Sequence, residues 1–164
     1  MCKFSLILLS VLLGCLVSGG AAGKIRVDSH EIRVVKDINL FVAQHPGLRV
    51  QALDKEIVPG KARVGDQTVR YNLGARIPSD RLVAQSADTF EYSRSQDVSL
   101  QLTYPESGAG SIVSYVELLC TQDNNDGNAY VVAGGIGQRY ISIILEASNT
   151  KNFSYQAQYY GMSD

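Results

Sequence analysis

The chain has 164 residues, of which 15 are basic and 16 acidic, and its formal net charge is −1. The sequence shows neither the basic stripe that nucleic-acid backbones require nor the polybasic tract that anionic membrane surfaces attract. We therefore expect neither a direct nucleic-acid partner nor a membrane partner.

Residues 1–23 predict a secretory signal peptide. Lys3 precedes an apolar run from Phe4 to Val17, and small residues follow it. This order is typical of a cleaved leader, and the apolar run is shorter than the roughly 20 residues that span a bilayer. The alternative, a buried N-terminal helix, would show a polar face, and this run has none. We expect cleavage after Ala22 or Gly23 and a secreted, extracellular product.

The mature chain is predicted to be one domain. Removing residues 1–23 from 164 leaves 141, enough to bury a core without disulfides. Lys3 is the only charged residue lost, so 14 basic residues remain against 16 acidic ones, a net charge of −2.

Cys120 is the only cysteine of the mature chain, because Cys2 and Cys15 lie in the leader. A lone cysteine cannot form an internal disulfide. Strand alternation places it on a face with three apolar residues, Ile112, Val116 and Leu118. We expect a buried apolar side chain, and an intermolecular disulfide or a reactive thiol are the alternatives.

Residues 24–70 are treated as an N-terminal extension of uncertain structure. KIRV and EIRVV alternate as short strands do, and His45-Pro46-Gly47 and the Val58–Lys61 stretch indicate turns. The apolar pieces Leu40–Ala43 and Leu48–Leu53 are too short to distinguish strand from helix. An edge element, a proregion and a packed extension remain open.

From Thr68 onward the pattern is that of short strands separated by turns. Asp97–Tyr104 alternates apolar and polar residues cleanly, and the last strand places Phe153, Tyr155, Ala157 and Tyr159 on one face. Strands are expected at Thr68–Leu73, Leu82–Gln85, Thr89–Tyr92, Asp97–Tyr104, Ser111–Thr121, Tyr130–Ala133, Arg139–Ala147 and Phe153–Tyr159. The fold class is therefore all-β, an antiparallel β-sandwich or barrel-like meander without a long amphipathic helix.

The order of motifs from Ser111 to Gly161 carries a family signature. It combines an Asn/Asp/Gly turn before Tyr130, the Gly134–Gly137 turn, the Tyr140–Leu145 strand, Ser148, and an aromatic strand closing on Tyr160-Gly161. With the upstream stretch Gly74–Gln85, this pattern resembles the insect family called multiprotein bridging factor 2. The resemblance covers roughly Tyr71 to Gly161, so we expect a family-like β domain over 71–164.

The resemblance implies a function by protein contact. The family takes its name from a transcriptional coactivator that bridges a DNA-bound activator and the general transcription machinery without reading DNA. That implication conflicts with the predicted leader, because an exported protein does not reach a promoter.

No catalytic constellation is visible in the sequence. Both histidines, His30 and His45, lie outside the family-like segment, so it has no imidazole for general-base catalysis or zinc binding. The carboxylates are scattered, and no spacing singles out a pair. We expect no catalytic, cofactor-binding or metal-binding residues, and hence no enzyme.

Two loops resemble ligand loops only in part. Gln122–Gly127 has the composition of a calcium-binding loop. In that register, however, Gln122 stands at position one in place of an aspartate, and Ala133 stands at position twelve in place of the bidentate glutamate. We expect a polar hairpin turn there. Gly134–Gly137 precedes a strand rather than the helix of a phosphate loop, so we expect a tight turn.

Three residues are singled out as site candidates. Glu117 interrupts an apolar strand, so it either faces an edge or pairs with a buried arginine. Tyr160 is out of phase with the core tyrosines, so it points outward and is suited to a binding surface. Asn152-Phe153-Ser154 is a glycosylation sequon, accessible to the modifying machinery if the chain is secreted.

Together these features predict a secreted, non-enzymatic binding protein with an unknown extracellular protein or small ligand as partner. The alternative is the transcriptional coactivator that the family resemblance implies. A hydrolase that uses carboxylates alone is a third class, which no residue pattern favours.

Overall fold

The computed structural model describes residues 33–34, 38–47, 49–59 and 65–162. The predicted leader, the KIRV strand and His30 lie outside these residues. Within them the chain forms one helix and eight strands: β1 (Arg33–Val34), α1 (Ile38–Gln44), β2 (Gln51–Ala52), β3 (Asp54–Val58), β4 (Gln67–Gly74), β5 (Arg81–Tyr104), β6 (Ile112–Gln122), β7 (Gly127–Gly134) and β8 (Ile141–Met162). The predicted all-β fold is confirmed.

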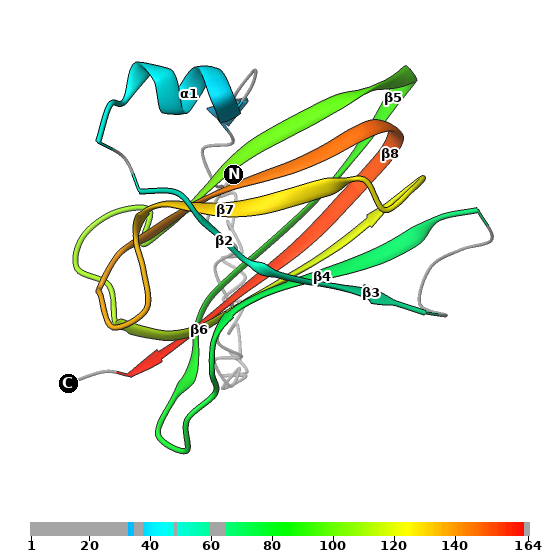
Figure 1. Cartoon of the computed structure of the whole chain (residues 1–164). Coiled ribbons are helices and arrows are strands. Elements are labelled where there is room, and N and C mark those ends of the chain that lie inside the picture. The colour runs from blue at the N-terminus through cyan, green and yellow to red at the C-terminus, as the bar shows by residue number, and fades with distance from the viewer. Residues whose placement is uncertain (1–32, 35–37, 48, 60–64, 163–164) are drawn as a thin grey trace, which may run out of the picture.

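All strand pairs are antiparallel, and β8 is the central strand. The order along the sheet is β1-β5-β8-β6-β4-β3, while β7 pairs with β8 and β2 pairs with β7. The N-terminal part of β8 lies between β5 and β7, and its C-terminal part lies between β5 and β6. Two half-sheets therefore share the long strands β5 and β8 (Figure 1).

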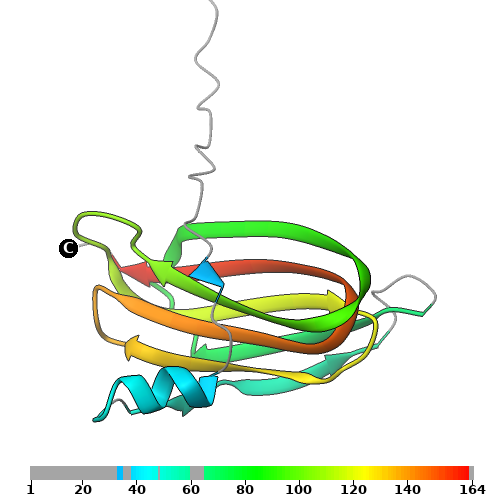
Figure 2. The ribbon, with the colours of Figure 1, turned by 90° about the horizontal axis from the view of Figure 1, so that it is seen from above.

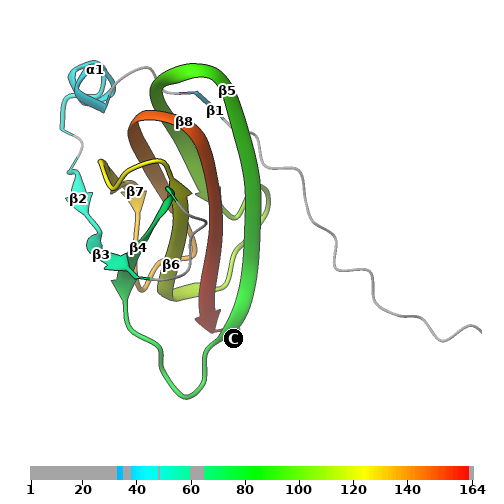
Figure 3. The ribbon, with the colours of Figure 1, turned by 90° about the vertical axis from the view of Figure 1, so that its right-hand side faces the viewer.

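Both long strands bend, and the bends fold the sheet into a nearly closed barrel (Figures 2 and 3). The β5–β8 register shifts between Glu91 and Gln96 and again between Gln96 and Val98, and Asn149 adopts a positive φ of 49° in β8. The predicted division of β5 into three strands and of β8 into two was wrong. The polar composition of the residues at the bends predicts turns. The strands instead continue through the bends, with β-bulges in their pairing.

Residues 123–126 do not form the predicted hairpin turn. β6 and β7 both run antiparallel to β8, so they lie end to end beside it instead of pairing with each other. The polar turn between them is held by its own side chains, since Asp126 N donates to Asn124 Oδ1 at 2.8 Å and Gln122 Nε2 donates to the Asp126 carbonyl at 2.7 Å.

The segment from β2 to β3 joins the two half-sheets on the side opposite β5. β2 pairs with β7, β3 pairs with β4, and Leu53 between them donates its N–H to the Ala129 carbonyl at 2.9 Å. This part of the N-terminal extension is therefore integrated into the barrel. The helix α1 lies outside the barrel wall (Figure 2).

The core lies between the half-sheets and consists of the inward residues of β4 to β8. Tyr104 and Tyr159 stack across it with ring centroids 5.3 Å apart. Tyr155 and Tyr159 are buried as predicted. Cys120 has no exposed surface, and burial raises the pKa of its thiol, so it is a core side chain. Val113 replaces the predicted Ile112 on its face, because the register shifts between Val113 and Tyr115.

Two glycines of the family-like motifs are required by close backbone contacts. Gly74 has φ +78°, and a Cβ there would lie 2.3 Å from the Ser114 carbonyl oxygen. Gly134 has φ +68°, and its Cβ would collide with the Tyr140 carbonyl. Both positions combine a left-handed backbone with a contact that only glycine permits.

Candidate functional site

The candidate site is a polar surface on the second half-sheet, here called the outer face. It is the side of β3, β4, β6, the C-terminal part of β8 and the N-terminal part of β5 that points away from the core. Strand register places Tyr115 beside Tyr160 and Glu117 beside both Asn72 and Gln158. The two candidates from the sequence, Glu117 and Tyr160, therefore lie on neighbouring strands of one face.

Glu117 belongs to a network of paired polar groups. Its Oε2 lies 3.3 Å from Arg70 Nε, and Arg70 Nη1 donates to Glu56 Oε2 at 3.0 Å. Arg70 is half-buried, with 26 % of its side chain exposed, so the arginine partner expected for Glu117 exists but lies at the surface. Arg70 Nε and Glu117 form an ion pair without hydrogen-bond geometry.

Tyr115 links this network to the next strand. Its hydroxyl donates to Asn72 Oδ1 at 2.9 Å and lies 3.3 Å from Glu117 Oε2. Burial and the nearby Glu117 carboxylate raise the pKa of Tyr115, so the phenol stays protonated and remains a donor at neutral pH.

Arg76 and Tyr160 form the end of the outer face. The guanidinium carbon of Arg76 lies 3.7 Å from the Tyr160 ring centroid, within cation–π range. Tyr160 also approaches Tyr115, with ring centroids 5.9 Å apart. The Tyr160 hydroxyl donates to Gln158 Oε1 at 3.2 Å. One cation and two aromatic rings are therefore grouped on adjoining elements.

Asp80 fixes Arg76 in this position. Arg76 Nη2 and Nε both lie 2.8 Å from Asp80 Oδ1, and Oδ2 accepts from Ile77 N and Ser114 Oγ, each at 2.9 Å. Loss of hydration alone would raise the pKa of Asp80. The hydrogen bonds from Ile77, Arg76 and Ser114 outweigh it, and the pKa lies below its ordinary value. The carboxylate is thus charged at neutral pH and holds the loop against β6.

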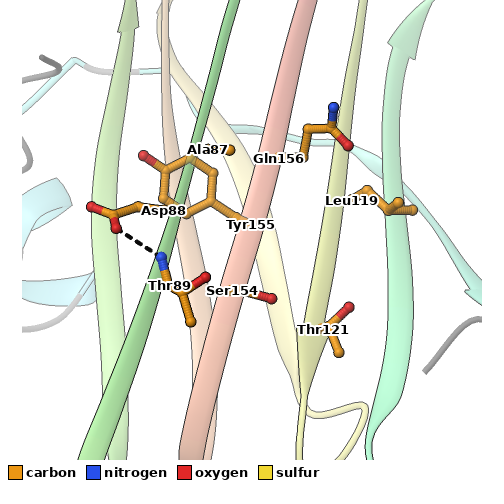
Figure 4. Close-up of a pocket in the computed structure, with 8 residues that line it drawn as sticks. All are labelled: Ala87, Asp88, Thr89, Leu119, Thr121, Ser154, Tyr155 and Gln156. Carbon is orange, nitrogen blue, oxygen red and sulfur yellow. Dashed lines mark hydrogen bonds between the residues drawn. The ribbon is translucent and has the colours of Figure 1, made fainter. Parts of the chain in front are cut away.

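A shallow groove of about 510 Å³ crosses the middle of the outer face (Figure 4). The residues around it are Ala87, Asp88 and Thr89 on β5, Leu119 and Thr121 on β6, and Ser154, Tyr155 and Gln156 on β8. Strand alternation directs the side chains of Asp88 and Tyr155, which are register partners, to the opposite face. Such a lining offers polar and apolar surface in similar amounts and is open to solvent, unlike a typical deep small-molecule pocket.

A family model described as Transcription activator MBF2 matches residues 73–161. The chain belongs to the MBF2 family. No curated protein and no solved structure matches it. The match confirms the family resemblance predicted from the motifs.

The MBF2 segment runs from the end of β4 to the end of β8. It contains Arg76, Asp80, Tyr115, Glu117 and Tyr160, while Glu56 and Arg70 precede it. Most of the outer face, including the Arg76–Tyr160 contact, is therefore built from the part of the chain that defines the family.

The sequon residue Asn152 lies apart from this grouping, just after the bend in β8. Its side chain is exposed, and its Nδ2 donates to Asp123 Oδ1 at 3.1 Å. Asp123 also accepts the Lys151 N–H, and these bonds outweigh partial burial and lower the pKa of Asp123. Glycosylation of Asn152 stays a prediction, and a glycan on Nδ2 would have to replace the contact with Asp123.

The other sequence features do not join the site. His45 directly follows α1, and its ring packs at a tilt against Phe41 with centroids 4.5 Å apart. Among the described residues no cluster of three His, Cys, Asp or Glu side chains could hold a metal. No helix in the described part of the chain is long and apolar enough to cross a membrane.

Sequence reasoning missed Arg70, Arg76, Asp80 and Tyr115 as site residues. A signal for two of them was present, because Arg76 and Asp80 lie four apart in the Gly74–Gln85 motif. Tyr115 alternates with Glu117 on β6 and so shares its face. Arg70 carried no signal, because its partners come from other strands.

Proposed function

We propose that this MBF2-family chain is a secreted, non-enzymatic binding protein that contacts its partner through the outer face. The observation that supports this most is the stacking of Arg76 on Tyr160 beside Tyr115. Tyrosine and arginine are enriched at the energetically dominant positions of protein interfaces. A protein partner is therefore favoured over a small ligand.

The side chains of this face are held in place before any partner arrives. Asp80 binds Arg76 through Oδ1, and Asn72 accepts a hydrogen bond from Tyr115. Side chains that are already ordered lose less conformational entropy on binding. This preorganisation supports recognition by a fixed surface.

The arrangement also supports a role without catalysis. Arg70 pairs with Glu56 and Glu117, and Asp80 accepts bonds from three groups. These charges neutralise and position one another, and the pKa of Asp80 is shifted away from the neutral range that a general base needs.

The alternative is a transcriptional coactivator acting through the same face. It is favoured by the family description, transcription activator, and it too requires protein contacts. The apolar leader at residues 1–23 favours export instead.

Expression of the full chain with a C-terminal tag in insect cells distinguishes these functions. The medium and the nuclei are assayed separately for the tag. A product in the medium that starts near Lys24 supports the extracellular binding protein. An uncleaved product in nuclei overturns it and favours the coactivator.

A further inference from the structure

We propose that the N-terminal part of β5 pairs with the same strand of a second copy of this chain. Over Arg81–Glu91, β8 borders β5 on one side. In the described part of the chain β1 is the only other strand beside β5, and it reaches only Leu100 and Gln101. Among the described residues, the first half of β5 therefore forms a sheet edge.

The hydrogen bonds of this edge show which residues point outward. Thr89 N donates to the Asp88 carboxylate at 2.7 Å, so this N–H lies outside the ladder with β8 (Figure 4). The register with β8 is unbroken from Ala84 to Glu91. Because alternate residues of an antiparallel edge strand direct their backbone groups to the same side, Gln85 and Ala87 also point theirs outward.

The centre of this edge lacks the usual protection against pairing. Natural edge strands are commonly blocked by lysine, proline or a bulge. Residues 84–87 are Ala-Gln-Ser-Ala, and both Gln85 and Ala87 have exposed side chains. A bulge between Leu82 and Ala84 and the bond from Thr89 to Asp88 confine the open stretch to this centre.

The charges along the edge select a second copy as the partner. Arg81 lies at one end, and Asp88 and Glu91 lie toward the other. In an antiparallel pair centred on Ser86, the basic end of each copy lies beside the acidic end of the other. A pair centred on Asp88 would place two carboxylates against each other, which costs free energy.

In the register centred on Ser86, Gln85 of each copy is opposite Ala87 of the other. Each of these pairs exchanges both backbone hydrogen bonds, and the two barrels form one continuous sheet. The side chains at these positions are exposed on the outer face, so they can be changed without disturbing the core.

Sedimentation velocity over a range of concentrations tests the proposal, using the protein purified after expression of the full chain and two charge variants. The wild-type chain should form a dimer. Gln85→Lys with Ala87→Lys places lysine against lysine and should shift the equilibrium to the monomer by at least about tenfold in Kd. The variant with Gln85→Glu and Ala87→Glu, measured alone, should also shift the equilibrium to the monomer, because it places glutamate against glutamate.

An equimolar mixture of the two charge variants should restore dimers, because each lysine then faces a glutamate. Circular dichroism verifies that both variants are folded. A wild-type chain that stays monomeric up to about 1 mM overturns the proposal. So does a dimer that the lysine variant leaves unchanged, or folded variants whose mixture stays monomeric.

Discussion

Arg76 lies over the ring of Tyr160, with its guanidinium carbon 3.7 Å from the ring centroid, while Asp80 Oδ1 lies 2.8 Å from Nη2 of the same guanidinium. This contact joins the loop after β4 to the last strand of the barrel. It brings together in space two motifs that lie far apart in the sequence, Gly74–Gln85 and the Tyr160-Gly161 ending.

The Arg76–Tyr160 contact should be measurable as a coupling energy. A cation–π pair at a partly exposed site contributes about 0.5–1 kcal/mol. Urea unfolding of Arg76→Ala, Tyr160→Ala and the double variant should give a coupling of this size. Leu40→Ala on α1, a change at another exposed site, should be additive with Tyr160→Ala. Full additivity of Arg76→Ala and Tyr160→Ala would refute the contact.

The free energy of unfolding should fall at acidic pH, in part because Asp80 becomes protonated. Its pKa is lower in the folded protein than in the unfolded chain, where aspartate titrates near 3.9, so its charge stabilises the fold at all higher pH. That stabilisation should be lost as the pH falls below about 4 and through the lower folded pKa. Asp80→Asn should flatten this part of the curve of unfolding free energy against pH. An identical acid dependence in both proteins would contradict the assignment.

Removing the hydroxyl groups of two buried tyrosines should change the free energy of unfolding in different directions. Tyr71 is 1 % exposed and its hydroxyl has no hydrogen-bond partner, whereas the Tyr104 hydroxyl accepts the Ser111 N–H at 2.8 Å. Tyr71→Phe should leave the free energy of unfolding unchanged or raise it by up to about 1 kcal/mol. Tyr104→Phe should lower it by about 1–2 kcal/mol, because the Ser111 N–H loses its partner. Equal losses in chemical denaturation would argue against these environments.

Gly74 and Gly108 allow backbone strain to be separated from steric collision. Their φ values are +78° and +75°, but a Cβ on Gly74 would meet the Ser114 carbonyl at 2.3 Å, and a Cβ on Gly108 would meet nothing within 4 Å. Gly108→Ala should cost about 1–2 kcal/mol from the left-handed backbone alone. Gly74→Ala should cost clearly more in the same thermal or urea unfolding assay. A similar cost at both sites would mean that the end of β4 moves away from β6 without a further loss of stability.

The sequence predicted the faces of the strands better than their lengths. Alternation correctly placed Tyr155 and Tyr159 in the core and Tyr160 outside it, because side chains of a strand point to opposite sides in turn. The bends in β5 and β8 could not be predicted, since Ser93–Gln96 has the composition of a turn, yet β5 continues through it and its register against β8 shifts between Glu91 and Gln96.

The candidate site was predictable one residue at a time, but its assembly was not. Glu117 was recognised as an interruption in an apolar strand and Tyr160 as a residue out of phase with the core. Their proximity depends on the β6–β8 register, and the bulge between Val113 and Tyr115 is needed to bring Tyr115 beside Tyr160. Arg76 acts from a loop, where periodicity gives no direction.

N-terminal sequencing of the native polypeptide, recovered from its source, tests most directly whether this protein acts outside the cell. We expect a mature chain that begins near Lys24 and is found in the extracellular fluid. A native chain that still begins at Met1 and is found inside cells would contradict this and favour the coactivator function.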